Sequence, residues 1–186
     1  DDTVEAAQEK DRERMLVALA RLPQPVLYIM GNGDYVELRD GSPRLRSLHG
    51  RRVDLGDCNF VGSQCSLPFM GNVNERPESV IAADLEALAP LVDSRTVLVT
   101  HVPARGSLDF GLLGRRIGLR PLAALIEQRR PLAHVHGHSH SGFGRCGRHF
   151  NVAAGTATRA MLIDLATLEH EVVEDGASVA EDPEAT

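Results

Sequence analysis

Aromatic and sulfur-containing side chains are scarce in this sequence. It has no tryptophan, two tyrosines and five phenylalanines, and no aromatic pair or basic groove indicates a nucleotide-binding site. The three cysteines, Cys58, Cys65 and Cys146, are odd in number and lack the spacing of a disulfide framework or a cysteine-rich zinc site. We therefore expect free, reduced thiols in a cytoplasmic protein.

Long apolar runs and an excess of positive charge are missing as well. No run approaches the roughly 18 apolar residues of a membrane-spanning helix, and the start lacks a basic segment followed by an apolar one. The formal net charge of -6 argues against general nucleic-acid or membrane-surface binding, because such proteins usually carry net positive charge. We expect a soluble protein with a small-molecule partner, and the sequence does not indicate an oligomeric state.

The length and composition fit one folded domain. The chain has 186 residues, of which 42% are hydrophobic, and this is enough for one sizeable core. We predict a single domain over residues 1–173. Residues 174–186 are acidic and rich in small side chains, so we predict a disordered tail there.

Helical and strand patterns alternate along the chain and predict an α/β fold. Apolar residues at helical spacing predict helices over residues 4–22 and 77–92, and another that opens at Pro121. Continuous apolar runs at 26–30, 96–100 and 132–136 predict buried strands. The remaining strands are predicted at 45–48, 52–55 and 59–61, as small antiparallel strands, and at 150–153, 160–165 and 169–173.

Polar side chains follow each of the three buried strands. Asn32 follows the first strand, His101 follows the second, and His138 and His140 follow the third. If these strands are parallel neighbours, their carboxyl ends meet at one edge of the sheet, where ligands bind in such folds. Neutral imidazole and amide oxygen suit zinc, manganese or iron, so the pattern predicts a metal site with room for water or substrate.

Each of these residues also has a simpler interpretation. Asn32 beside glycine could be only a turn residue, and His101 could be satisfied by hydrogen bonds to the backbone. His134 and His136 alternate with His138 and His140, but Gly137 interrupts the strand, so we interpret the first two as strand residues. The remaining histidines, at positions 49, 149 and 170, show no partner pattern and default to surface or structural roles.

Three ordered motifs give the chain a family resemblance. Residues 31–34 spell GNGD, His101 lies in THVP, and residues 137–140 spell GHSH. A glycine-rich stretch with Asp109, Gly111, Gly114 and Gly118 precedes the last motif. In order and context these motifs resemble those of the calcineurin-like metallophosphoesterases, over about residues 26–154.

The resemblance implies a fold, a cofactor and an activity. The fold would be two packed mixed β-sheets flanked by helices, an αββα sandwich. Asn32, His101 and His138 would bind one divalent metal ion and His140 a second, the metals being Mn, Fe or Zn, and Asp34 would be the catalytic residue. The implied reaction is hydrolysis of phosphomonoesters or phosphodiesters through a dinuclear metal-bound hydroxide.

The chain departs from the family pattern in two ways. The family's early DxH and GD motifs, which complete the metal ligands, have no counterpart here, since Gly56 and Asp57 come after GNGD. The chain thus resembles a family member without its first strands, and its start at Asp1 and not at a methionine fits that interpretation. Gly33 stands where the family usually has a histidine that assists the leaving group, which predicts lower turnover.

Two functional hypotheses remain open. The first is a phosphoesterase in which Arg105, four residues after His101, contacts the phosphate, although Arg105 could equally be a solvent-exposed arginine. The second is a non-catalytic or truncated relative that acts as a binding or regulatory module. A structural zinc protein is less favoured, because the candidate ligands lie at strand ends and lack paired cysteines.

Overall fold

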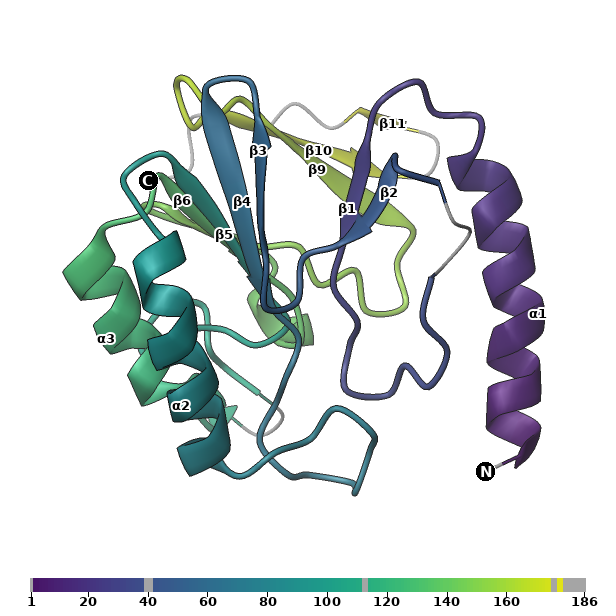
Figure 1. The fold of residues 1–186 in the computed structure, drawn as a ribbon, viewed down its shortest axis with the longest axis horizontal. Helices are drawn as coiled ribbons and strands as arrows, with labels where there is room; N and C mark the ends of the chain where they lie inside the picture. Colours follow the sequence, from purple (N-terminus) through teal and green to yellow (C-terminus); the bar gives the residue numbers. More distant parts are fainter. Residues whose placement is uncertain (1, 39–41, 112–113, 175–176, 179–186) are drawn as a thin grey trace.

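The structure, a computed structural model, describes residues 2–38, 42–111, 114–174 and 177–178. Figure 1 shows α2 and α3 together on one side, the strands in the middle, and α1 on the opposite side. This is the predicted α/β sandwich of mixed sheets flanked by helices. The helices are α1 (Asp2–Leu19), α2 (Glu78–Leu88) and α3 (Arg120–Arg129), with the 3-10 turns η1 (Ala89–Leu91) and η3 (His140–Gly142).

Strands form a six-stranded sheet, a three-stranded sheet and a two-stranded sheet. The six-stranded sheet has the order β3-β4-β5-β6-β8-β7, in which β4, β5, β6 and β8 are parallel and the edge strands β3 and β7 are antiparallel to their neighbours. Its strands are β3 (Arg52–Leu55), β4 (Cys58–Ser63), β5 (Thr96–Thr100), β6 (Ala133–His136), β7 (Gly144–Cys146) and β8 (His149–Asn151). The smaller sheets contain β1 (Val26–Tyr28) with β2 (Leu45–Ser47), and β9 (Arg159–Ile163), β10 (His170–Glu174) and β11 (Ala177–Ser178).

The main apolar core lies between the six-stranded sheet and helices α2 and α3. Val61 of β4 and Leu98 of β5 are fully buried there, against the apolar faces of both helices. Burial of one such side chain stabilises the fold by roughly 1.5–3 kcal/mol, so this layer holds the parallel strands in place. The helix residues in this core are Ile81, Leu85, Leu88, Leu122 and Leu125.

The other face of the sheet receives the smaller sheets. The ring of Phe150 in β8 contacts that of His170 in β10, with centroids 6.0 Å apart. Gly62 of β4 lies where β1 and β2 end, and a Cβ atom there would be 2.5 Å from Cβ of Leu48 and 2.9 Å from Cγ2 of Ile29. Only a glycine allows this close approach, so Gly62 brings the first strand up to the six-stranded sheet.

The first strand differs from its prediction. The apolar run at 26–30 predicts a strand buried on both faces, but β1 ends at Tyr28 and its three residues are only half-buried. It pairs with β2 alone, and the two strands are parallel, not antiparallel as predicted for the 45–48 segment. An apolar run gives no information about which strand lies alongside, and this explains the error.

The second half of the chain follows its prediction more closely. β5 spans the predicted residues, and α2 begins one residue after Pro77 and passes into η1, where Pro90 lacks the N–H needed to continue the α-helix. β7 was not predicted. β10 reaches Glu174 and pairs with β11, so regular structure extends into the predicted disordered tail, while residues 179–186 lie outside the described residues.

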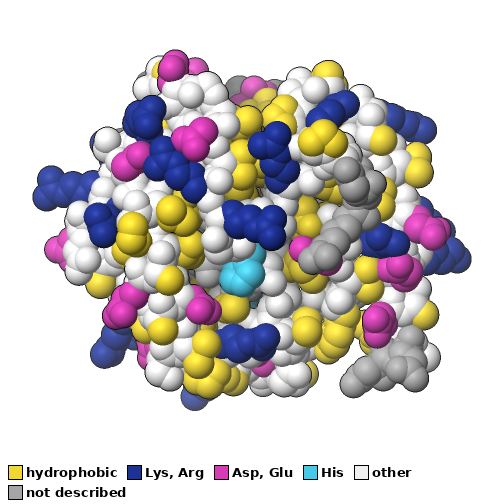
Figure 2. Space-filling view, in the orientation of Figure 1, with side chains coloured by type: hydrophobic (Ala, Val, Ile, Leu, Met, Phe, Trp, Pro, Cys, Tyr) yellow, Lys and Arg dark blue, Asp and Glu magenta, His cyan; other side chains and the backbone are white. Residues whose placement is uncertain are grey.

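The outer surface carries charges of both signs. Figure 2 shows arginine or lysine side chains interspersed with acidic ones over one whole face, with a histidine in a central hollow. Within the described residues, no helix combines the length and apolar character that crossing a membrane requires.

Candidate metal centre

Asn32 and His101 meet across two sheets. Asn32 follows β1 in a tight turn, and His101 directly follows β5. The imidazole Nε2 of His101 lies 2.9 Å from the amide oxygen Oδ1 of Asn32. Their predicted convergence is therefore present, but it does not arise from neighbouring strands of one sheet, since β1 lies outside the six-stranded sheet.

His138 joins this pair from the end of β6. Its ring contacts the ring of His101 edge to face, with centroids 4.7 Å apart. The amide of Gly137 donates to the carbonyl of His101 at 3.1 Å, which ties the two strand ends together. His138 has a φ of 63°, in the left-handed region that costs a side-chain-bearing residue roughly 1–2 kcal/mol, and such strain is common at functional sites.

His140 begins the 3-10 turn η3 and is exposed. A Cβ at Gly155 would lie 3.8 Å from Cβ of His140, so the segment after β8 runs beside it. His140 lies near enough to His101 and His138 to lower the pKa of both. No hydrogen bond joins the His140 ring to another described residue.

His101 and His138 are held neutral near neutral pH. Burial, followed by the proximity of His138 and His140, lowers the pKa of His101 to about 4. Burial also lowers the pKa of His138, followed by the effect of His140, while the carboxylate of Glu75 acts in the opposite direction. Neutral imidazole is the form that binds metal ions, so His101 has no net proton to release near neutral pH. Its Nε2 donates to the amide oxygen of Asn32, so the ring hydrogen moves to Nδ1 when Nε2 binds a metal.

Glu75 is a member of this site that the sequence did not indicate. Its side chain is 8% exposed, and its carboxylate accepts hydrogen bonds from the Asn32 side chain at 3.2 Å and the Phe69 amide at 2.8 Å. Burial acts to raise the pKa of Glu75, but these bonds, with those from the amides of Met70 and Gly71, lower it to about 2. Glu75 thus stays ionised, orients Asn32 and holds the loop over residues 69–75.

Helix α1 clamps the GNGD turn. The side-chain amide of Gln8 donates to the carbonyl of Gly33 at 2.8 Å and accepts from the amide of Tyr35 at 2.7 Å. Asp34 closes the turn itself, since its Oδ2 accepts from the amide of Gly31 at 2.5 Å. A Cβ at Gly33 would meet nothing within 4 Å, so the position has room for a side chain.

The glycine-rich stretch forms a loop beside the GHSH turn, with residues 112–113 outside the described residues. Asp109 is completely buried, and its Oδ1 accepts from Arg116 at 2.6 Å. The carbonyl of Phe110 accepts from the hydroxyls of Ser139 and Ser141, which fixes the loop against GHSH.

Arg105, the predicted phosphate contact, belongs to the same loop. Its Nη1 donates to the carbonyl of Arg116 at 3.2 Å, and its Nε lies 4.0 Å from Oδ2 of Asp109. No contact between Arg105 and the candidate metal ligands is found among the described residues, so its role in substrate binding stays a prediction.

The donors fit one metal ion better than two. Asn32, His101 and His138 offer an amide oxygen and neutral imidazole nitrogens in one place, a donor set suited to zinc, manganese or iron. A second ion would have only His140 of the predicted ligands. Among residues 2–38, 42–111, 114–174 and 177–178, no group of three or more His, Cys, Asp or Glu side chains is arranged to hold a metal.

The other histidines of the alternating run lie within β6. His134 and His136 are in register with Leu98 and Thr100 of the neighbouring strand, which puts them on the helix-covered face of the sheet. Both are buried, as expected for strand residues. His149, expected to be at the surface or structural, is half-buried and contacts His134.

Comparison with known proteins gives a likeness of fold. No family model matches the chain. One solved crystal structure aligns with 91% of this chain and 73% of its own, with a TM-score of 0.72 and 17% identity. The crystal structure of TT1561 of Thermus thermophilus aligns with 71% of this chain and 60% of its own, with a TM-score of 0.50 and 19% identity.

A match to a curated protein is short. Probable rhamnogalacturonate lyase C of Emericella nidulans is 49% identical over 49 residues, which are 26% of this chain and only 4% of that protein. So short a match gives no information about the activity of this chain. The two structural likenesses, both under 25% identity, concern the fold alone and agree with the α/β sandwich described above.

Proposed function

We propose that this protein is a metal-dependent hydrolase of phosphomonoesters or phosphodiesters. The observation that carries the proposal is the 2.9 Å approach of His101 Nε2 to Asn32 Oδ1, with the His138 ring against His101. Three chain segments far apart in sequence deliver these donors to one place, and all come from strand ends. The metallophosphoesterase-like fold supports the same interpretation.

The residues of the site have separable roles. Asn32, His101 and His138 would hold one divalent ion, and His140 is the remaining predicted donor for a second. When bound, such ions supply charge neutralisation for phosphate oxygens and activation of water near neutral pH. Glu75 orients the Asn32 amide, so that its oxygen points to His101 while its nitrogen donates to the carboxylate.

Asp34 and Gly33 define what acid–base help the chain provides. The carboxylate of Asp34 is engaged with the amide of Gly31, and Gly33 offers no side chain that could protonate a leaving group. General acid–base help is typically worth about 10²–10⁴-fold. We therefore expect esters with good leaving groups, such as p-nitrophenol, to be hydrolysed faster than alkyl esters.

The test combines metal content with turnover. The purified protein is loaded with manganese, iron or zinc, its bound metal is measured by elemental analysis, and hydrolysis of p-nitrophenyl phosphate and bis(p-nitrophenyl) phosphate is followed. Asn32→Ala and His138→Ala should each lower bound metal and turnover together, while Cys146→Ser, at an exposed position on β7, should leave both unchanged. Turnover that survives both ligand substitutions would contradict the assignment.

The alternative is a non-catalytic binding or regulatory module. One observation favours it: only His140 of the predicted ligands is left for a second ion among the described residues. Binding of one metal ion with no hydrolysis of either ester, under any of the three metals, would select this alternative.

A further inference from the structure

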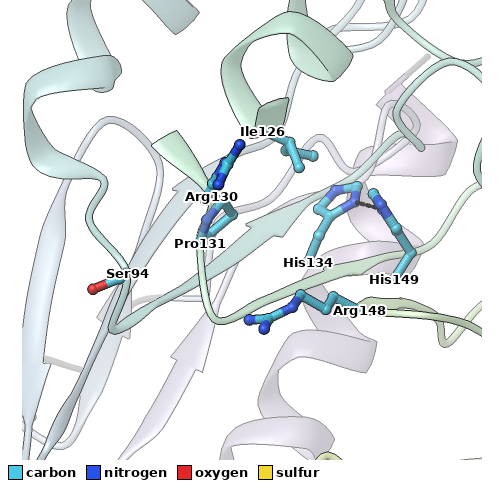
Figure 3. A pocket seen from close by; sticks show the side chains of 7 residues that line it. All are labelled: Ser94, Ile126, Arg130, Pro131, His134, Arg148 and His149. Atoms are coloured by element: carbon cyan, nitrogen blue, oxygen red, sulfur yellow. Dashed lines mark hydrogen bonds between the residues drawn. The ribbon is translucent and has the colours of Figure 1, made fainter. Parts of the chain in front are cut away.

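A second site lies at the opposite end of the parallel strands. A pocket of about 520 Å³ opens where β5, β6 and β8 begin, whereas the candidate metal ligands follow the ends of β5 and β6. Figure 3 shows the rings of His134 and His149 on one side of this pocket, Arg130, Pro131 and Ile126 on another, and Arg148 below them. Its volume is within the range of ordinary small-molecule sites. The lining residues are Ser94, Ile126, Arg130, Pro131, His134, Arg148 and His149.

A chain of hydrogen bonds fixes the orientation of the two histidines. The single hydroxyl hydrogen of Thr100 goes to the carbonyl of Val102, which is 2.6 Å away. Thr100 Oγ1 can therefore only accept from the other atom near it, Nε2 of His134 at 2.8 Å. His134 is buried, and burial lowers its pKa well below the usual value, so its ring is neutral and its Nδ1 carries no hydrogen.

The same reasoning fixes His149. Its Nδ1 lies 3.0 Å from Nδ1 of His134, and because the latter is an acceptor, Nδ1 of His149 must be the donor. Burial lowers the pKa of His149 as well, so its Nε2 is an acceptor near neutral pH. No described residue donates to this Nε2. It is the ring nitrogen of His149 left for a ligand in the pocket.

Two guanidinium groups complete the polar part of the pocket. Arg130 follows α3 in a left-handed conformation, and no ion pair or side-chain hydrogen bond is found for it among the described residues. Arg148 donates one hydrogen bond, from Nη1 to the carbonyl of Leu132 at 3.2 Å, and retains its other N–H groups. No Asp or Glu lines the pocket within the described part of the chain, although the whole chain carries a net charge of -6.

We propose that this pocket binds a small organic molecule with a phosphoryl group. Its charged oxygens would accept from Arg130 and Arg148, whose planar N–H groups match phosphate geometry. Its P–OH, present in the singly protonated form, would donate to Nε2 of His149, and its apolar body would lie against Ile126 and Pro131. A carboxylate carries no hydrogen near neutral pH and cannot make the bond to Nε2, so the pocket selects phosphoryl over carboxyl groups.

The proposal does not depend on the metal centre, and its test separates the two. Phenylphosphonate, which phosphoesterases cannot hydrolyse as an ester, is titrated calorimetrically into metal-free His138→Ala protein, in which the metal centre cannot hold it. Inorganic phosphate and benzoate are titrated in parallel. Phenylphosphonate should bind more tightly than either, because phosphate lacks the apolar body and benzoate lacks the acidic hydrogen.

Arginine variants connect the binding to the pocket. Arg130→Gln and Arg148→Gln should each weaken phenylphosphonate binding by about tenfold or more, as expected for a hydrogen bond to a charged group. Arg14→Gln, on the exposed face of α1, is the matched control and should bind like the parent. The proposal would be overturned by equal affinity for phenylphosphonate in all three variants, or by the absence of phenylphosphonate binding to the parent protein.

Nuclear magnetic resonance of the histidine ring nitrogens provides an independent readout. Binding should move the Nε2 resonance of His149 and leave the hydrogen on Nε2 of His134 in place. A ligand-induced shift at neither ring would overturn the role of His149, and equal binding of inorganic phosphate and phenylphosphonate would overturn the requirement for an organic body.

Discussion

Two groups of histidines occupy opposite ends of the same strands and differ in how their rings are satisfied. The metal-end histidines are His101, His138 and His140, which lie in turns after the strands. The ring of His101 contacts the ring of His138 and the amide oxygen of Asn32. The pocket-end histidines are His134 and His149. In this second group, ring nitrogens are engaged with Thr100 and with each other.

The difference shows what distinguishes a candidate metal ligand from a structural histidine. Burial lowers the pKa of His101 in the first group and of His134 in the second, so a depressed pKa alone does not separate the groups. His134 and His138 differ in the hydrogen bonds that their ring nitrogens make. His134 uses both of its nitrogens, whereas His138 has no hydrogen bond from its ring to any described residue.

The largest effect should come from removing a pocket-end ring. His134→Ala removes a fully buried side chain, leaves Thr100 and His149 without their partner, and should lower the free energy of unfolding by about 2–4 kcal/mol. Urea denaturation measures this loss. His140→Ala, at an exposed metal-end position, should change the free energy of unfolding by less than about 0.5 kcal/mol. Similar losses in both variants would contradict the difference between the two groups.

The next largest effect should be a loss of stability at acid pH, which comes from histidines of both groups. The folded-state pKa of His101, about 4, lies below the 6.5 of an unfolded histidine, so the unfolded chain binds more protons between these values. The stability that these neutral histidines contribute is present above about pH 6.5 and is lost as the pH falls towards 4. The loss is at most about 1.4 kcal/mol per pH unit for each titrating histidine side chain.

Urea denaturation of the metal-free protein at several pH values measures this slope. The His101→Asn variant should show a shallower dependence, because it removes one of the titrating groups. A stability that stays constant from pH 7 to pH 5, or a slope unchanged in His101→Asn, would contradict the neutral state of these rings.

Substitution of His138 should change the free energy of unfolding less than substitution of His134. Because His138 has a φ of 63°, His138→Gly relieves left-handed strain while it removes a metal donor. The free energy of unfolding of the metal-free protein should change by less than about 1 kcal/mol, whereas bound metal, measured by elemental analysis, should fall. A large loss of stability would place His138 with the structural histidines.

The smallest change in stability should come from adding a histidine to the metal end. A Cβ at Gly33 meets nothing within 4 Å, so Gly33→His should change the free energy of unfolding by no more than about 0.5 kcal/mol. If the protein is a phosphoesterase, turnover of alkyl phosphate esters should rise more than turnover of p-nitrophenyl phosphate. Gly33→Ala is the control, and an equal rise in both variants would exclude acid catalysis by the new ring.

Local patterns were sufficient for much of the fold. The bounds of β5 follow from its apolar run, and the buried faces of α2 and α3 follow from their periodicity. The grouping of Asn32, His101 and His138 could be predicted because each residue follows a strand. The placement of β1 outside the main sheet could not, since the close approach at Gly62 depends on Leu48 and Ile29, which no local pattern identifies.

Long-range polar contacts also could not be predicted from the sequence. Glu75 lies 43 residues from Asn32, in a loop with no helical or strand period, and only the folded chain brings its carboxylate to that amide. Gln8 stands on a mostly exposed helix whose polar residues are indistinguishable from a solvated face. Such residues become visible only once the partner segment is in place.

The clamp of Gln8 on the GNGD turn makes helix α1 a reporter of that turn. The two hydrogen bonds, to Gly33 and from Tyr35, form only when the helix and the turn are both in their folded positions. By reciprocity, any ligand that holds the turn more firmly also holds the helix more firmly, with the same coupling free energy. Slower proteolytic cleavage within residues 2–19 on addition of metal would register that coupling, at a point in the chain that carries no predicted ligand.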